Sequence, residues 1–304
     1  MWKESLPPVI KSRLSKHSSA LPYLNLVSYG DFATNLDYVL VSPHSSDGSA
    51  AFWQICKSLK DTKNWPSYET YLAVEKDSGA WDLTLALANQ LQSLGYQVLC
   101  IELAYPRGLL DGGRLLEHAL RPVLDPEMSE LLGPQLLQIH QLVLSFVSTI
   151  YHLINEQKAR LIDIHSMASF DAQLANFTLD HENIEEYVAA YVNEQDSQRQ
   201  RGIDLIYRDA SGKIIGSEAL ATSVRETYAA QNIVVAENEP YCAEKAYLMY
   251  QHMKNCPAIA IDYPKHEFVS NRSLENLNLK KVQIDKKAIT FHAKILAQAL
   301  DTII

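Results

Sequence analysis

The chain has 304 residues, of which 47% are hydrophobic and 21% charged, and it carries a net charge of −9. This composition is typical of a globular protein with a sizeable core, and it excludes a disordered chain. The negative charge argues against a general binder of nucleic acid or of anionic membranes, because both partners require a basic face.

The cysteines and the apolar runs bear on where the protein works. Four cysteines, at positions 56, 100, 242 and 256, form no C-x-x-C motif, which is typical of reduced thiols in the cytoplasm. Residues 1–30 contain no apolar run of the length that a signal peptide needs. No stretch of 18 or more apolar residues occurs either, so we expect no membrane span.

The N-terminal half of the chain alternates apolar runs with turns. Residues 1–30 contain three prolines and are expected to form an N-terminal arm or a short edge element. Short apolar runs at 37–43 and 97–103 are typical of buried strands. Residues 79–95 and 134–157 have the apolar spacing of helices, and the second is expected to begin with a proline in its first turn.

The C-terminal half continues the alternation. Further strands are expected at 160–164, 233–237 and 258–263, and further helices at 217–231, at 241–254 and over the last 20 residues, with Asp285 as the N-cap of the last helix. Residues 203–209 and 213–215 flank a turn, which indicates a hairpin or loop. Residues 180–200 are polar and predict an exposed helix or a covering insertion.

Strands that alternate with helices predict an α/β fold with a mostly parallel or mixed central sheet and helices on both faces. The sequence has no internal repeat, low-complexity segment or linker. We therefore expect one domain over residues 1–304.

Polar residues gather where the predicted strands end. They are His44 and Asp47, Asp111 and Arg114, His165 and Ser166, Asn238, and Asp262. Because ligand sites of open α/β sheets form at the carboxyl ends of the strands, these residues predict a site at one edge of the sheet.

A metal centre is the chemistry that these residues favour. His44 and Asp47 form an H-x-x-D pair in a turn, and His165 follows another buried strand. A catalytic zinc takes three such ligands and leaves one position open. We expect the two histidines to share one coordination sphere. Asp77 and Glu75 are the competing acid ligands, and Asp47 could instead form only an Asx-turn.

Other chemistries have weaker signals. The sequence contains no G-x-S-x-G, and its serine and histidine neighbours do not form a general-base pair. It contains neither G-x-x-x-x-G-K-[ST] nor G-x-G-x-x-G, so no nucleotide is implied.

Six segments, in order, resemble motifs of the N-formylglutamate amidohydrolase family, whose fold is of the zinc-carboxypeptidase/phosphorylase-like type. They are Pro43-His44-Ser45, Asp77-Ser-Gly-Ala-Trp81, Arg107 to Asp111-Gly-Gly-Arg114, Asp163-Ile-His165-Ser166-Met167, Asn238-Glu-Pro-Tyr241, and the strand ending at Asp262. The chain departs from the family at Gly113, where the motif has Asn, and at Asp262, where Glu is expected.

The resemblance implies hydrolysis of an N-acylated amino acid, for example an N-formyl one, or of a related small amide, with one zinc ion as cofactor. The zinc ligands would be His44, His165 and a carboxylate, first Asp47 and alternatively Asp77. Asp262 or Glu267 would be the general base. Arg114, assisted by Arg107, would bind the substrate carboxylate, and Asn238 and Ser166 would complete the substrate site.

Two side chains have structural alternatives. Arg114 could form only a structural salt bridge to Asp111, and Asp262 could pair with Lys265 or His266. Two alternative functions also remain open. The missing Asn and the shorter late acid favour a relative that binds a ligand or partner without turnover, and the other alternative is a metallopeptidase acting on small peptides.

Overall fold

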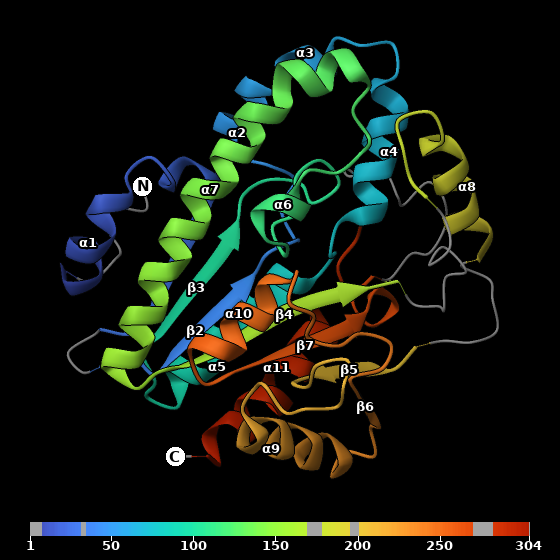
Figure 1. Ribbon diagram of the computed structural model, residues 1–304. Helices are drawn as coiled ribbons and strands as arrows, with labels where there is room; N and C mark the ends of the chain where they lie inside the picture. Colours follow the sequence, from blue (N-terminus) through green and yellow to red (C-terminus); the bar gives the residue numbers. More distant parts are fainter. Residues whose placement is uncertain (1–7, 32–34, 169–177, 195–200, 270–281, 304) are drawn as a thin grey trace.

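The computed structural model describes residues 8–31, 35–168, 178–194, 201–269 and 282–303. These residues contain one seven-stranded mixed sheet, in the order β1-β3-β2-β4-β7-β5-β6, with helices on both faces (Figure 1). The predicted α/β class with a mixed central sheet is therefore confirmed.

The centre of the sheet is parallel and its two flanks reverse. The strands are β1 (Leu24–Tyr29), β2 (Tyr38–Ser42), β3 (Val98–Leu103), β4 (Arg160–Met167), β5 (Ile203–Ile206), β6 (Val235–Glu237) and β7 (Ala258–Pro264). Strands β3, β2, β4 and β7 run parallel, whereas β1 and β5 pair antiparallel with β3 and β7. Every residue of β2 and β3 is buried, because helices cover both faces.

Helices of very different lengths connect the strands. They are α1 (Pro8–Leu14), α2 (Ala50–Ile55), α3 (Lys57–Lys60), α4 (Trp65–Glu75), α5 (Ala80–Ser93), α6 (Leu116–Ala119), α7 (Pro126–Gln157), α8 (Ile184–Glu194), α9 (Glu218–Ala229), α10 (Leu248–Asn255) and α11 (Lys286–Asp301). Short 3₁₀ turns are η2 (Ser15–His17), η3 (Leu21–Tyr23) and η5 (Lys265–Glu267).

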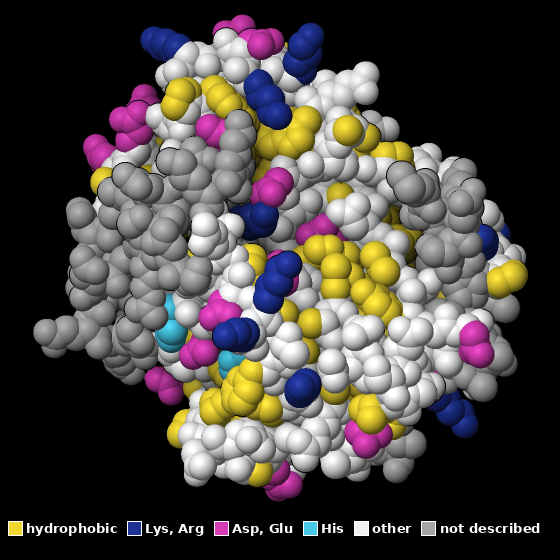
Figure 2. Space-filling model, turned by 180° about the vertical axis from the view of Figure 1, so that it is seen from behind, with side chains coloured by type: hydrophobic (Ala, Val, Ile, Leu, Met, Phe, Trp, Pro, Cys, Tyr) yellow, Lys and Arg dark blue, Asp and Glu magenta, His cyan; other side chains and the backbone are white. Residues whose placement is uncertain are grey.

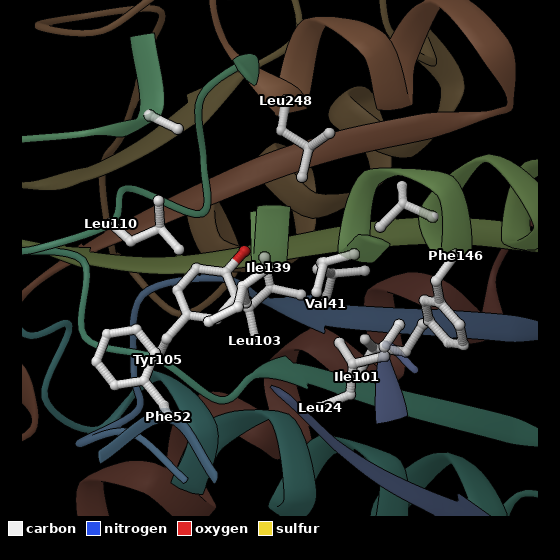
Figure 3. Packing of buried hydrophobic residues seen from close by; sticks show 14 of the residues in the cluster. Leu24, Val41, Phe52, Ile101, Leu103, Tyr105, Leu110, Ile139, Phe146 and Leu248 are labelled. Carbon is white, nitrogen blue, oxygen red and sulfur yellow. The ribbon is translucent and has the colours of Figure 1, made fainter. Parts of the chain in front are cut away.

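Two apolar clusters pack on opposite faces of the sheet. Helices α7 and α10 contribute to the first cluster, and α5, α9 and α11 contribute to the second. Figure 3 shows the first cluster, in which Ile139 and Phe146 of α7 lie over Val41 of β2 and Ile101 of β3. The strands therefore contribute alternate side chains to each cluster, as the period of two requires.

Helix α7 begins eight residues before the predicted start at Pro134. The Asp125 carboxylate accepts a hydrogen bond from the Met128 amide at 2.8 Å, and Pro126 occupies the first turn. This N-cap starts the helix, and Pro126 is tolerated after it because the first turn needs no N–H donor at that position. Pro134 therefore lies inside the helix. The prediction that Pro134 opens the helix is wrong because it overlooked this cap.

Helix α7 is long and apolar enough to cross a membrane, judged by length and composition alone. The sequence analysis did not predict this, because the chain contains no unbroken run of 18 apolar residues. The helix is amphipathic, and it buries one apolar side against the sheet, including Ile139 and Phe146 (Figure 3). Its apolar content is thus explained by its place in the core.

Helix α10 begins at Leu248 and not near residue 241. The backbone before it pairs with the loop after β3, since the Leu115 amide donates to the Ala246 carbonyl and the Leu248 amide donates to the Gly113 carbonyl at 2.7 Å. These backbone groups are therefore occupied outside a helix.

The edge element expected within residues 1–30 and the helix expected within residues 180–200 are both present. Within residues 1–30, β1 forms an antiparallel edge strand on β3. Within residues 180–200, α8 lies against α4, where the Tyr71 and Tyr187 rings are 5.7 Å apart; residues 195–200 lie outside the described residues. The expected strand at 160–164 continues to Met167, because β7 pairs with it throughout.

The surface carries charges of both signs (Figure 2), and the cysteines form no disulfides. Acidic and basic side chains are interspersed over the side opposite to the view of Figure 1 (Figure 2). All four cysteines are free thiols, and three of them are buried.

The N-cap of α11 provides a test of this fold. The Asp285 carboxylate accepts hydrogen bonds from the Lys287 and Ala288 amides, as the sequence predicted. We expect Asp285→Ala to lower the free energy of unfolding by about 1 kcal/mol, because two amides lose their partner. Urea unfolding measures this loss. Lys294→Ala on the exposed side of α11 is the control, and an equal loss in both variants would contradict the capping role.

Candidate metal centre

A pocket of about 470 Å³ lies at the carboxyl ends of the central strands. His44, Asp77, His165 and Asp262 line one part of it. Its lining also contains the tyrosines Tyr187, Tyr191, Tyr241 and Tyr247. The pocket thus lies where the topology of an open α/β sheet predicts a ligand site.

His44 and Asp77 are brought together by a backbone hydrogen bond between two turns. His44 follows β2, and its carbonyl accepts from the Asp77 amide at 3.0 Å. Asp77 lies in the turn between α4 and α5, where Gly79 has a φ of +88°. A Cβ atom at Gly79 would lie 2.5 Å from the Phe268 side chain. The turn therefore needs glycine both for its conformation and for space.

The sequence predicted that His165 follows a strand, but His165 lies within β4. The register places it opposite Asp262 of β7, and Asp262 in turn lies opposite Asp204 of β5. Three neighbouring strands therefore present a histidine and two acids side by side.

The side chains of His44, Asp77 and His165 converge in the way that a metal site requires. One ligand atom from each lies within 4.8 Å of the others, and all three residues are buried. Asp77 Oδ2 is 3.5 Å from His44 Nδ1 and 3.3 Å from His165 Nδ1. Ligand atoms that surround a tetrahedral zinc at about 2 Å are about 3.3 Å apart. The two rings are 5.1 Å apart, so the predicted proximity of the histidines is confirmed.

Each histidine turns its second nitrogen to another buried acid. His44 Nε2 is 2.8 Å from Asp111 Oδ1, and His165 Nε2 is 3.1 Å from Asp163 Oδ1. Metal-binding histidines commonly have such a carboxylate behind them, which fixes the tautomer and the ring orientation. His44 Nδ1, which faces Asp77, has no hydrogen-bond partner in the described part of the chain. The donor set therefore fits a cation.

The charges in this group depend on one another. Burial alone would raise the pKa of Asp77, but the imidazoles of His165 and His44 beside its carboxylate hold that pKa well below its usual value. Burial opposes charge on Asp111 as well, and His44 with Arg107 lowers the pKa of that carboxyl. Burial opposes the charged form of His165, yet Asp163 and Asp77 raise its pKa well above normal. Without a metal, a proton on His165 supplies the positive charge that these acids need.

Gly113 gives a physical reason for one departure from the family motif. Its amide donates to Asp111 Oδ1 at 3.1 Å, and the same nitrogen lies 2.9 Å from His44 Nε2. A Cβ atom there would lie 2.5 Å from two atoms of the His44 ring. An asparagine cannot occupy this backbone position without moving the imidazole, so the backbone itself contacts His44.

The two predicted substrate arginines have different surroundings. Arg107 donates to Asp77 Oδ1 at 3.2 Å, and its other nitrogens lie 3.8 Å from Asp111 and from Glu75. Arg114 forms the salt bridge considered above, from its Nε to Asp111 at 3.1 Å, and it stacks on the Tyr247 ring. Both line the pocket. Arg107 is therefore surrounded by acids, whereas within the described residues the two terminal nitrogens of Arg114 have no hydrogen-bond partner.

The two candidate bases are in different environments. Asp262 lines the pocket, and its Oδ1 has no hydrogen-bond partner among the described residues. Burial raises the pKa of Asp262 to about 7. Lys265 donates instead to the Val74 carbonyl at 2.6 Å. Glu267 lies 3.5 Å from His266 and 3.4 Å from His292 and is not among the residues that line the pocket.

Three other predicted site residues have structural contacts. Both Asp47 carboxylate oxygens are 2.8 Å from Lys76 Nζ, and the side chain is 51% exposed, so Asp77 and not Asp47 is the acid between the histidines. The Asn238 side chain accepts from the amides of Tyr207 and Arg208 and does not line the pocket. The Ser166 amide donates to Asp77 Oδ2 at 3.2 Å.

Sequence reasoning assigned no role to Asp163, overlooked Asp204, and considered Lys265 only as a partner of Asp262, whereas Lys265 lines the pocket. Asp163 could have been found, because residues two apart on a strand share a face, and it therefore lies beside His165. Asp204 accepts from the amides of Glu239 and Tyr241, and burial raises its pKa to about 6. Its place became visible only through the pairing of β5 with β7, which the sequence does not reveal.

Two solved structures are similar to this chain. An N-formylglutamate amidohydrolase from Ralstonia eutropha JMP134 aligns over 92% of this chain and 99% of its own, with a TM-score of 0.53 and 13% identity. A gene product from Agrobacterium tumefaciens aligns over 94% and 97%, with a TM-score of 0.49 and 14% identity. No protein-family model and no curated protein sequence matches the chain. The first likeness confirms the resemblance at the level of the fold.

Proposed function

We propose that this protein is a zinc-dependent amidohydrolase that acts on an N-acylated amino acid or a related small amide. The observation that carries the proposal is the convergence of His44, His165 and Asp77, with a second acid behind each histidine. Zinc bound there would polarise the amide carbonyl and lower the pKa of water. The four free cysteines agree with a cytoplasmic enzyme.

The chain's own residues would divide the remaining work. Asp262 would accept a proton from the attacking water and donate it to the leaving nitrogen, as a general base and then acid. Its support is its position in the pocket beside His165 and its raised pKa. The free end of Arg114 would bind the substrate carboxylate through two parallel hydrogen bonds. Arg107 would hold Asp77 in place.

Metal analysis and a substrate panel test the proposal together. We expect about one zinc per chain, because the site has one set of three ligands. We expect chelator-sensitive hydrolysis of N-formyl or N-acetyl amino acids. Asp77→Asn should lose most bound zinc and most activity, since it removes a charged ligand. Asp47→Asn is the matched control and should retain both.

Several outcomes would contradict the proposal. Zinc binding without hydrolysis of any amide would favour a ligand-binding protein, and hydrolysis confined to small peptides would favour a peptidase. A protein that binds no zinc would exclude the metal centre. Equal zinc loss in Asp47→Asn and Asp77→Asn would reject the choice of acid.

The general base has its own prediction. We expect Asp262→Asn to lower kcat by roughly 10²–10⁴-fold, because general-base catalysis contributes that much. Glu267→Gln should have little effect. Asp262 must be ionised to accept a proton, so activity should fall on acidification. A bound cation lowers the pKa of Asp262, so this fall should be centred at or below pH 7.

Zinc content and the pH profile of kcat provide the readouts for both variants. Normal turnover in Asp262→Asn, with loss in Glu267→Gln, would transfer the role to Glu267. Normal turnover in both variants would reject both assignments.

Arg114 has a distinct kinetic signature. We expect Arg114→Lys to raise KM for substrates with a carboxylate and to leave kcat nearly unchanged, because lysine keeps the charge and loses the planar fork. Neutral amides are the control, since their KM should not change. A fall in kcat at constant KM would mean that Arg114 acts in the transition state instead.

A further inference from the structure

Behind His165, away from the pocket, a line of polar groups runs through the apolar core; Asp163 and His252 are buried, and Tyr151 is partly buried. Asp163 lies two residues before His165 on β4, and its Oδ2 is 3.8 Å from Nε2 of His252 on α10. His252 Nδ1 is 2.8 Å from the hydroxyl of Tyr151 on α7. Three elements thus contribute one polar group each to a path that ends at His165.

The polarity of this path follows from the chemistry of its members. Burial lowers the pKa of His252 to about 4, so its ring is neutral and carries one N–H. Burial also raises the pKa of Tyr151, so the phenol keeps its proton. A carboxylate faces Nε2 and can only accept, so the ring proton is on Nε2, directed at Asp163, and the Tyr151 hydroxyl donates to Nδ1.

These polar groups occupy places where apolar side chains would pack well. His252 is 1% exposed, and its neighbours in α10 include the buried Leu248 and Met253. In the described part of the chain, His252 Nε2, Asp163 Oδ1 and His165 Nε2 have no hydrogen-bond partner of good geometry. Buried polar atoms are costly when they are not satisfied, so their alignment calls for an explanation.

The two histidines of the site also differ in how their acids are held. Asp111, behind His44, contacts Arg114 and the Gly113 amide at the pocket. Asp163, behind His165, is 2% exposed and faces the core, where His252 is the second group directed at it. A carboxylate that is not held by solvent or by an arginine needs another donor to keep one rotamer.

We propose that His252, oriented by Tyr151, is a positioning residue that holds Asp163 and thereby keeps His165 with Nδ1 turned toward Asp77. This inference rests on the proposed metal site and goes beyond its ligands. His252 touches neither substrate nor metal, and it acts only through Asp163.

Zinc affinity, measured by chelator competition on the folded protein, tests the inference. We expect His252→Leu to weaken zinc binding about 10–100-fold, the usual effect of losing a group behind a metal ligand. His252→Gln should recover most of the affinity, because the glutamine amide nitrogen can occupy the place of Nε2. Tyr151→Phe should weaken binding less than His252→Leu does.

The opposite face of the sheet provides a matched control. His292 is also buried, at 3% exposure, and its Nδ1 is 3.4 Å from the Tyr228 hydroxyl. His292→Leu and Tyr228→Phe remove the same groups from the core and should leave zinc affinity unchanged. The visible spectrum of the Co²⁺-substituted protein is a second readout. It should change in His252→Leu and Tyr151→Phe and not in the two controls.

The outcomes separate this inference from the proposed function. A wild-type protein that binds neither Zn²⁺ nor Co²⁺ would overturn the proposed function and this inference with it. A wild-type protein that binds zinc, with wild-type affinity and spectrum in a folded His252→Leu variant, would overturn the positioning role alone. If His252→Leu does not fold, Tyr151→Phe decides. Unchanged affinity and an unchanged Co²⁺ spectrum in Tyr151→Phe would overturn the role.

Discussion

The buried Asp77 carboxylate is the group on which the arrangement of the site depends. It is 1% exposed, and a charge in such a position persists only with partners of opposite charge or with hydrogen bonds. Two imidazoles and the Ser166 amide contact one of its oxygens, and Arg107 contacts the other. The surrounding elements can be understood as the framework that brings these donors to one point.

That framework combines the register of the sheet with two close backbone approaches. The parallel pairing of β4 with β7 sets His165 beside Asp262. The turn through Gly79 brings the Asp77 amide within hydrogen-bond distance of the His44 carbonyl. At Gly113 the bare backbone contacts the imidazole of His44. Rigid elements thus orient the site, as a preorganised metal centre requires.

The core strands and the pairing of the two histidines could be predicted, because continuous apolar runs and strand-end polar residues follow simple rules. Which carboxylate lies between the two histidines could not be predicted. The H-x-x-D spacing favours Asp47, but Lys76 holds that side chain, and Asp77 reaches the site through a turn that spacing does not encode. The structural role of Asn238 could not be predicted for a similar reason, because the backbone amides that donate to its side chain become its neighbours only in the folded chain.

Helix α8 adds a consequence of a different kind. It packs on α4, and its Tyr187 hydroxyl donates to Glu75 at 2.5 Å. Glu75 ends α4, two residues before Asp77. The tyrosine-bearing side of the pocket and the acid between the histidines are therefore joined through a short stretch of chain. The side of the pocket formed by α8 is therefore held by the same stretch of chain that positions Asp77 between the histidines.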